Sequence, residues 1–185
     1  MSWVALDRGI RMATELGLKA DLRAWIIARD AVHADVLLRG FDPALQSFTQ
    51  AYDFPGTLDA SLLAIGLVGF LPWTDPRVVS TVRAIQRHLT TPDGELVYRY
   101  RSPDGLDGEE GAFSICTFWL AESLLRIGDR ASAERIVRRM LRYANHVGLY
   151  SEEIDPATGE FLGNFPQGFT HIALIHTAVA LAEGL

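Results

Sequence analysis

Residues 173–182 read ALIHTAVALA, a run of ten in which only two side chains are polar. A helix with that sequence is apolar around most of its circumference, and a helix of this kind is usually buried on all sides. The segments 58–71 and 111–127 have the same character. We therefore predict three inner helices, at 58–71, 111–127 and 166–183, that share one core.

A second set of segments is amphipathic instead. The segments 20–39, 75–89 and 130–144 carry charged side chains, such as Arg83, on the side away from an apolar stripe. We expect these three helices to lie on the outer surface. A further helix is predicted at 2–16, where apolar residues recur at helical spacing before a glycine ends it.

Outer and inner helices alternate, with a repeat of roughly 54 residues, which is typical of stacked helical hairpins. Because neighbouring helices run up and down, every second connection leaves on the same face. The connections on one face are very short, whereas those at 40–57, 91–110 and 147–165 are long. Long ordered loops are usually functional, so the face that carries them is where we expect the site.

Composition narrows the possible partners. The chain has 185 residues, 20.4 kDa, 49% hydrophobic residues and a net charge of −6, which indicates one domain or part of a larger one. This charge argues against nucleic acid or an anionic membrane as a partner. No signal peptide or spanning segment is visible, and the single cysteine, Cys116, fits a reducing compartment. We expect a cytoplasmic protein with a buried, inert thiol.

The long loops combine aromatic rings with carboxylates and an arginine. Flat apolar rings beside charged hydrogen-bonding groups suit a sugar, which has apolar faces and a rim of hydroxyls. This content favours a closed toroid of hairpins over an open solenoid. In the alternative interpretation, the aromatic rings merely seal the inner core. The loop residues concerned are Phe48, Tyr52, Phe54, Tyr98, Arg99, Tyr100, Glu110, Tyr150, Glu152 and Phe165.

Two adjacent carboxylates are the strongest candidates for chemistry. Glycoside hydrolysis uses a protonated and an ionised carboxyl group, and Glu152 or Glu153 could be the ionised one, since both precede an inner helix whose N-terminus stabilises negative charge. Asp59 fits a helix N-cap better, and Asp155 fits a turn. His171 fits a hydrogen-bonded core position better than a site. The sequence has no metal-binding or nucleotide-binding motif, and hydrolysis by two carboxylates and water requires no cofactor.

Several stretches, in order along nearly the whole chain, resemble glycoside hydrolase family 15, the glucoamylase, glucodextranase and trehalase group. The similar stretches are WVALDRGIR at 3–11, LDASLL at 58–63 with LVGFLP at 67–72, VYRYR at 97–101, EGAFSICTFWL at 110–120, GLYSEEIDP at 148–156 and GNFPQGFTH at 163–171. The resemblance implies an all-α (α/α)6 toroid and inverting hydrolysis of an α-glucosidic bond.

The resemblance also implies roles for individual residues. The family's general base is the first glutamate of a Ser/Ala-Glu-Glu/Gln motif, which corresponds to Glu152. Glu153 is the weaker candidate, since glutamine occurs at its position. Arg99 matches an arginine that binds the non-reducing glucose beside the scissile bond. The candidate substrate-binding residues are Arg99, Glu110, Phe113, Glu153 and Phe165.

In one respect the chain departs from the family. It holds about seven of the twelve helices of the toroid, so residues 1–185 are expected to be the C-terminal portion of a single catalytic domain. The family's general acid precedes the stretch that resembles WVALDRGIR and is absent here. The expected partners are a glucose-containing saccharide or trehalose and the preceding half of the domain. Two alternatives remain: a non-catalytic saccharide-binding or assembly module, and an unrelated helical-hairpin interaction protein.

Overall fold

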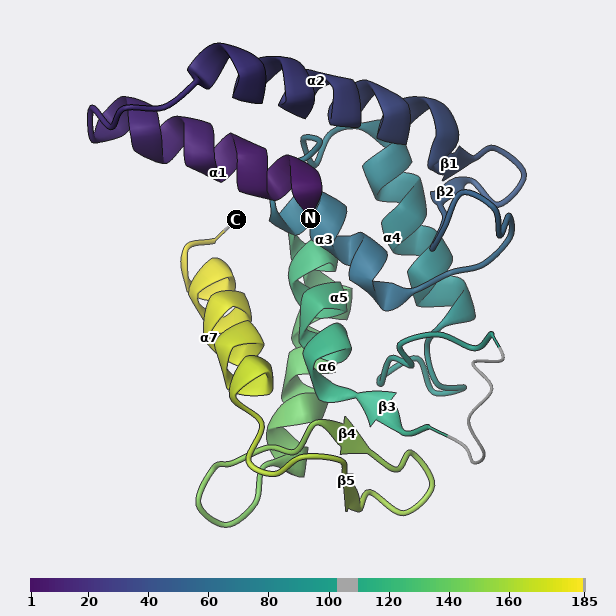
Figure 1. Ribbon diagram of the computed structural model, residues 1–185. Helices are drawn as coiled ribbons and strands as arrows, with labels where there is room; N and C mark the ends of the chain where they lie inside the picture. The colour runs from purple at the N-terminus through teal and green to yellow at the C-terminus, as the bar shows by residue number, and fades with distance from the viewer. Residues whose placement is uncertain (103–109, 185) are drawn as a thin grey trace.

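The computed structural model describes residues 1–102 and 110–184. This part of the chain is mainly helical, with short strands confined to the long connections (Figure 1). In chain order the elements are α1 Ser2–Glu15, α2 Leu22–Arg39, β1 Phe41–Asp42, β2 Ser47–Phe48, the 3-10 helix η1 Ala60–Leu63, α3 Ala64–Leu67, α4 Pro76–His88, β3 Ala112–Phe113, α5 Ser114–Arg126, α6 Arg130–Met140, the 3-10 helix η2 Leu141–Tyr143, β4 Glu153–Ile154, β5 Phe161–Leu162 and α7 Gly168–Ala182.

Helix α5 is the centre of the core. It packs against both α6 and α7, and it also contacts α4 and η1. Phe118, Leu120 and Leu124 on this helix are completely buried. The prediction of an inner helix at 111–127 is thus confirmed, although β3 occupies its first residues.

The inner helix predicted at 58–71 is shorter than expected. It consists of η1 followed by the single turn of α3. Gly69 ends it in a left-handed conformation (φ 73°), which glycine adopts readily. The ring of Trp73 then folds back so closely that a Cβ at Gly66 would lie 2.4 Å from it. This return of the chain leaves no room for a longer helix.

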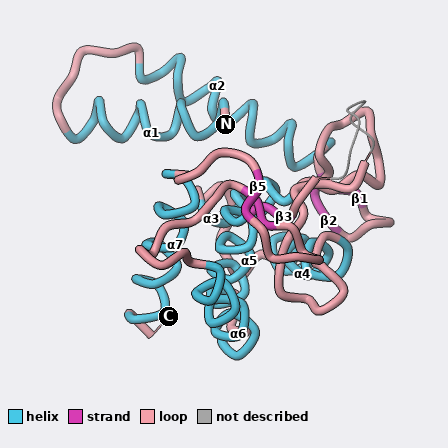
Figure 2. Tube along the Cα trace, turned by 90° about the horizontal axis from the view of Figure 1, so that it is seen from below, coloured by secondary structure: helices cyan, strands magenta, loops and turns pink. Residues whose placement is uncertain are grey.

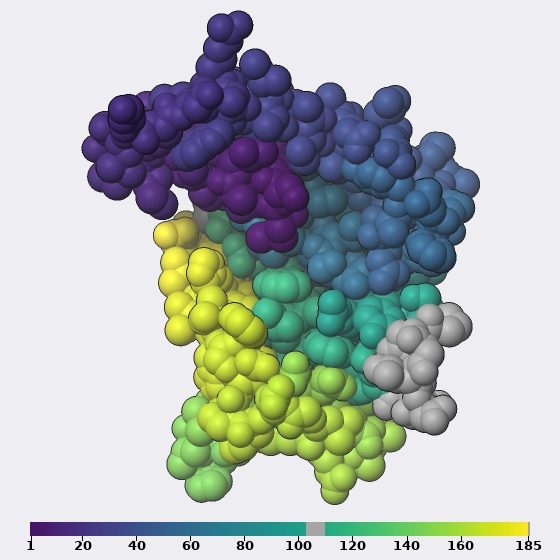
Figure 3. Space-filling model, in the orientation of Figure 1, coloured from purple at the N-terminus to yellow at the C-terminus, as the bar shows by residue number. Residues whose placement is uncertain are grey.

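Helix α7 is not buried on all sides, contrary to the prediction for 166–183. Its face of small residues packs on α5, where the Thr177 hydroxyl donates a hydrogen bond to the Phe118 carbonyl oxygen (3.2 Å). The opposite face is exposed, and in Figure 3 α7 lies along an edge of the molecule in yellow. The exposed residues of this open face are Phe169, Ile172, Ile175 and Val179.

The outer helices agree with the predictions for α4 and α6 but only in part for α2. α4 buries Val78, Val82 and Ile85, and its N-terminus is capped by Asp75, whose carboxylate accepts a hydrogen bond from the Arg77 amide. No residue of α2 is fully buried, and only its C-terminal part contacts a core, where Val36 and Leu37 pack against the cluster that contains Phe48 and Phe70. The reason is that α2 packs mainly on α1, and this hairpin lies to one side of the other elements (Figure 2).

The long connections contain the strands, which the sequence did not predict. β1 pairs with β2 in the first connection, while β3, β4 and β5 form one antiparallel sheet that joins the second connection to the third. The Ala60 amide donates to the Arg99 carbonyl oxygen (2.7 Å), which ties the end of the first connection to the second. The three long connections therefore meet, as predicted, beside the N-termini of the inner helices. No helix in the described residues is long and apolar enough to cross a membrane.

Candidate functional site

The adjacent glutamates lie at the start of β4, the central strand of the three-stranded sheet. The Glu152 carbonyl oxygen accepts a hydrogen bond from the Ser114 amide (2.9 Å), and its own amide donates to the Asn164 carbonyl oxygen (2.9 Å). Glu153 pairs with Phe113 on β3. The backbone of Glu152 is therefore fixed both to the first residue of α5 and to the segment that leads into α7.

The Glu152 carboxylate is held by one of its oxygens. Oε2 accepts hydrogen bonds from the Asn164 amide (3.0 Å) and from the Asn164 side-chain Nδ2 (2.8 Å). The side chain is half-buried and lies against Gly163. No hydrogen bond from a described residue reaches Oε1. One oxygen is thus positioned by the protein while the other is left for a ligand or water.

The Glu153 carboxylate has different neighbours. Its Oε2 accepts a hydrogen bond from the Gly111 amide (2.9 Å). Burial raises the pKa of Glu153 above its usual value, and the negative charges of Glu110 and Glu152 add to this shift, whereas the Gly111 hydrogen bond opposes it. Glu152 precedes β4, which begins at Glu153, and its carboxylate contacts Asn164 where that of Glu153 contacts Gly111. The two glutamates therefore lie in different environments.

A cluster of the other candidates surrounds the start of α5. Arg99 is half-exposed; its Nε lies 3.7 Å from a carboxylate oxygen of Asp59, and its guanidinium carbon lies 6.0 Å from the centre of the Phe113 ring. Tyr100 donates a hydrogen bond to Oε1 of Glu110 (3.4 Å). The structure thus brings Arg99, Glu110 and Phe113 together around one helix N-terminus, with Glu153 opposite Phe113 in the sheet. Residues 103–109 of the same connection lie outside the described residues.

The loop aromatics divide into two groups. Phe48 and Tyr150 are each only 1% exposed, so they seal the core, as the alternative interpretation holds. Phe165 is 47% exposed and packs on Phe161, with ring centres 5.4 Å apart, next to Asn164. Of these rings, Phe165 is the one on the Glu152 side that a ligand could reach.

Three other predictions about single residues are confirmed. The Asp59 carboxylate caps η1 by accepting a hydrogen bond from the Ser61 amide (2.7 Å). His171 is hydrogen-bonded within the fold: Nε2 accepts from the Tyr150 amide (3.3 Å), so Nδ1 donates to the Gln167 carbonyl oxygen (2.7 Å). Cys116 is buried, and this burial raises its pKa to about 12.

One residue of the site had no predicted role. Asn164 stands in the stretch GNFPQGFTH, but nothing in the sequence indicates that its side chain reaches back twelve positions to Glu152. Pairing of β4 with β5 creates that proximity. Within residues 1–102 and 110–184, no group of three or more His, Cys, Asp or Glu could hold a metal ion.

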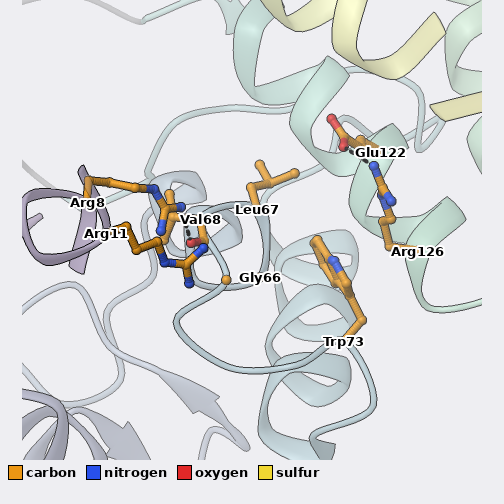
Figure 4. Close-up of a pocket in the computed structure, with 9 residues that line it drawn as sticks. Arg8, Arg11, Gly66, Leu67, Val68, Trp73, Glu122 and Arg126 are labelled. Atoms are coloured by element: carbon orange, nitrogen blue, oxygen red, sulfur yellow. Dashed lines mark hydrogen bonds and ion pairs between the residues drawn. The ribbon is translucent and has the colours of Figure 1, made fainter. Parts of the chain in front are cut away.

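A separate cavity of about 330 Å³ lies at the opposite, short-loop end of α5 (Figure 4). Arginines line it, but each of them has a protein partner: Arg8 donates to the Val68 carbonyl oxygen (2.7 Å), and Arg126 pairs with Glu122 (3.2 Å). Arg11 pairs with Asp7 (3.1 Å). Trp73 and Glu122 also line the cavity, and its three arginines share two acidic partners, Asp7 and Glu122. The residues that the sequence predicts to bind a sugar lie at the loop end, which is therefore the candidate site.

Solved structures of glycosidases share this fold. A wild-type glycosidase superposes with a TM-score of 0.71 at 19% identity, over 89% of this chain and 46% of its own. A glutamate-to-alanine variant of a glycosidase in complex with glucose gives a TM-score of 0.72 at 18% identity, with the same coverage. The architecture is therefore a partial helical toroid of the glycosidase type.

The sequence comparison is more specific than the fold. The model of the family described as glycosyl hydrolases family 15 matches residues 1–133 and 129–179, and the chain belongs to this family. It is 44% identical over 183 residues to a trehalase of Thermoplasma acidophilum and 50% identical over 182 residues to a trehalase of Mycobacterium tuberculosis. These matches cover 99% and 97% of the chain but only 31% and 26% of the two relatives. The chain thus spans less than a third of their length.

Proposed function

We propose that residues 1–185 form the C-terminal portion of a single (α/α)6 domain that hydrolyses the α-glucosidic bond of trehalose or a related glucoside with inversion. Family membership and the trehalase names of the relatives support this proposal. We further propose that the remaining helices, together with the general acid, come from a segment that precedes this portion in the intact domain.

The position of Glu152 carries the proposal. A general base has to be ionised, held in place and open toward water on one side. Glu152 meets the last two needs because Asn164 holds Oε2 while Oε1 has no described partner.

In the proposed reaction, Oε1 of Glu152 takes a proton from a water molecule as the water oxygen bonds to the anomeric carbon. The glycosidic C–O bond breaks, and the general acid proposed for the preceding segment protonates the leaving oxygen. Inverting enzymes keep their two carboxyl groups about 6.5–9.5 Å apart, which leaves space for that water. The reaction consumes only the glucoside and water, and these two carboxyl groups accept and donate the protons.

The neighbouring residues would bind the sugar rather than react with it. The Arg99 guanidinium cannot exchange a proton at ordinary pH, but it presents a fork of donors to sugar hydroxyls. Phe165 offers a flat apolar ring to a sugar face, and Glu110 offers an acceptor, whereas Phe113 is only 9% exposed and packs in the core. Glu153 already accepts the Gly111 amide, so its proposed role is to hold this loop beside the sugar.

The test compares two neighbouring variants in the polypeptide that includes the preceding segment. Glu152→Gln keeps the shape but removes the proton acceptor, and loss of a general base lowers the rate by about 10² to 10⁴. Glu153→Gln should lower it much less, because glutamine still accepts the Gly111 hydrogen bond. Turnover of trehalose, with the anomer of the product followed by NMR, measures both.

Three outcomes would contradict the proposal. Near-parent turnover by Glu152→Gln, or an inactive Glu153→Gln, would remove Glu152 as the base. Inversion at one anomeric carbon of trehalose releases one β-glucose and one α-glucose, so initial products that are all α-glucose would exclude inversion. Saccharide binding without any turnover by the parent would favour the non-catalytic binding module.

A further inference from the structure

We infer that Gly163 and Asn164 form a positioning device for Glu152, in which Asn164 holds one carboxylate oxygen so that the other faces the reacting water. This inference rests on the proposed function, since it gives Asn164 a task in the same reaction. Asn164 would be a positioning residue, acting through Glu152 without touching the sugar's reacting atoms.

The two donors of Asn164 come from different parts of the residue but meet at one acceptor. Its backbone amide and its Nδ2 lie 3.0 and 2.8 Å from Oε2 of Glu152. A carboxylate only accepts hydrogen bonds, so the NH2 group of the Asn164 amide is the end that faces it. Two donors on one oxygen fix both the direction and the rotation of the carboxylate plane.

Gly163 makes this arrangement possible for two reasons. Its φ of 69° is left-handed, a conformation that side chains other than glycine rarely adopt. A Cβ at this position would also lie 2.9 Å from Oε2 and 3.1 Å from Cβ of Glu152. Any larger residue at 163 would therefore push the carboxylate away from Asn164.

The backbone hydrogen bonds explain why Asn164 contacts Glu152 and not Glu153. The Glu152 amide donates to the Asn164 carbonyl oxygen (2.9 Å), so the two residues are joined by three hydrogen bonds, while Glu153 turns to Gly111. Asn164 thus distinguishes between the adjacent glutamates. Its side chain is exposed, so a bond that merely stabilised the fold would gain little there.

The chain contains a matched control. Asn145 is the only other asparagine in the sequence, and its Oδ1 accepts hydrogen bonds from the Val147 and Leu149 amides (3.0 and 2.9 Å). An aspartate keeps this acceptor role. Asn145→Asp and Asn164→Asp therefore make the same change of charge, but only the second removes a donor from Glu152 and places a like charge beside it.

The first experiment uses the 185-residue chain and does not depend on turnover. In NMR spectra, the side-chain amide signals of Asn164 should move with pH over the range in which carboxylates titrate, and this movement should vanish in Glu152→Gln but persist in Glu153→Gln. The Asn145 amide signals should not respond to either variant. An Asn164 amide that ignores Glu152→Gln would overturn the inference while leaving the proposed function intact.

The second experiment measures kinetics in the polypeptide that includes the preceding segment. Asn164→Asp should lower kcat about tenfold to a hundredfold, part of the loss expected for the base itself, with little change in KM. The acid limb of its kcat/KM profile should move to higher pH, and Asn164→Ser, which retains a donor, should recover part of the rate. Asn145→Asp should match the parent.

Each result bears on one proposal. If Asn164→Asp loses thermal stability and raises KM but leaves the acid limb in place, the role of Asn164 is structural and the inference is wrong. Parent-like kinetics in Asn164→Asp beside an inactive Glu152→Gln would also reject the inference yet support Glu152 as the base. An active Glu152→Gln would instead reject the proposed function.

Discussion

The open face of α7 predicts that the isolated chain associates with itself. Phe169, Ile172, Ile175 and Val179 recur at helical spacing and are between 50% and 67% exposed. Contiguous apolar surface of this kind drives association. The parent chain should therefore form dimers or larger species in sedimentation velocity experiments at high chain concentration.

The magnitude follows from the exposure of these side chains. Complete burial of one such side chain contributes about 1.5–3 kcal/mol, so covering the exposed half contributes about 1 kcal/mol per residue. A symmetric contact covers four residues on each of two chains, or about 8 kcal/mol. Association itself costs about 4 kcal/mol or more, which leaves about 4 kcal/mol or less and a dissociation constant of about 1 mM or weaker.

The perturbation is the double substitution Ile172→Gln with Ile175→Gln. It removes about 2 kcal/mol from each chain and about 4 kcal/mol from the dimer, so the dissociation constant should rise about a thousandfold. The matched control replaces Ile27 and Leu38 of α2 by glutamine. These side chains are also exposed, at 60% and 82%, but lie away from α7. The control should leave the association unchanged.

Two results would refute this reasoning. A parent chain that sediments as a sharp monomer with a cooperative melt would show that the open face needs no cover. Loss of association in the α2 control, and not in the α7 variant, would place the contact elsewhere. In the polypeptide that includes the preceding segment, the α7 variant should lower Tm, because there its face is expected to be covered.

Three further predictions concern single residues. Cys116 should resist modification by a disulfide reagent at pH 8 in the folded chain, because burial raises its pKa to about 12; fast reaction without denaturant would contradict this. Glu153→Gln should raise Tm at pH 7 but not at pH 4. Burial disfavours the charged form of Glu153 in the folded chain and so raises its pKa. The charged form therefore destabilises the fold above the unfolded pKa of about 4.3, and this cost is absent below that pKa. An equal gain at both pH values would exclude this cause. Arg99→Lys, in the polypeptide with the preceding segment, should raise KM and lower kcat because lysine lacks the fork of donors. It should change Tm little, because Arg99 is half-exposed and its 3.7 Å ion pair with Asp59 contributes little stability. Parent-like kinetics would remove Arg99 from the site.

The sequence predicted helices well where the local pattern determines burial. α5 is apolar on nearly all sides and is buried on nearly all sides, because α4, α6 and α7 surround it. The same pattern in α7 led to a wrong expectation. Burial depends on what lies next to a helix, and no described element covers the outer face of α7.

The structure of the connections could not be read from the sequence in the same way. Strands of two residues are too short to show an alternating pattern, and the pairing of β3 with β4 joins residues about forty positions apart. The resemblance to a family motif pointed to Glu152, whose role as the general base stays a prediction. Asn164 was missed because its proximity to Glu152 arises from the β4–β5 hairpin, which has no local signal.

Hydrogen bonds connect the proposed site to helix α7, which carries the open face. The Gln167 amide donates to the Tyr150 carbonyl oxygen (2.9 Å), and the Thr170 hydroxyl donates to the Ser151 carbonyl oxygen (3.2 Å). The N-terminus of α7 is thus fastened to the two residues before Glu152. A segment that covers the open face would set the position of α7 and, through these bonds, that of the proposed base. We therefore expect that supplying the proposed general acid in a segment unable to pack on α7 would give little turnover, whereas a segment that packs there would raise the rate and Tm together.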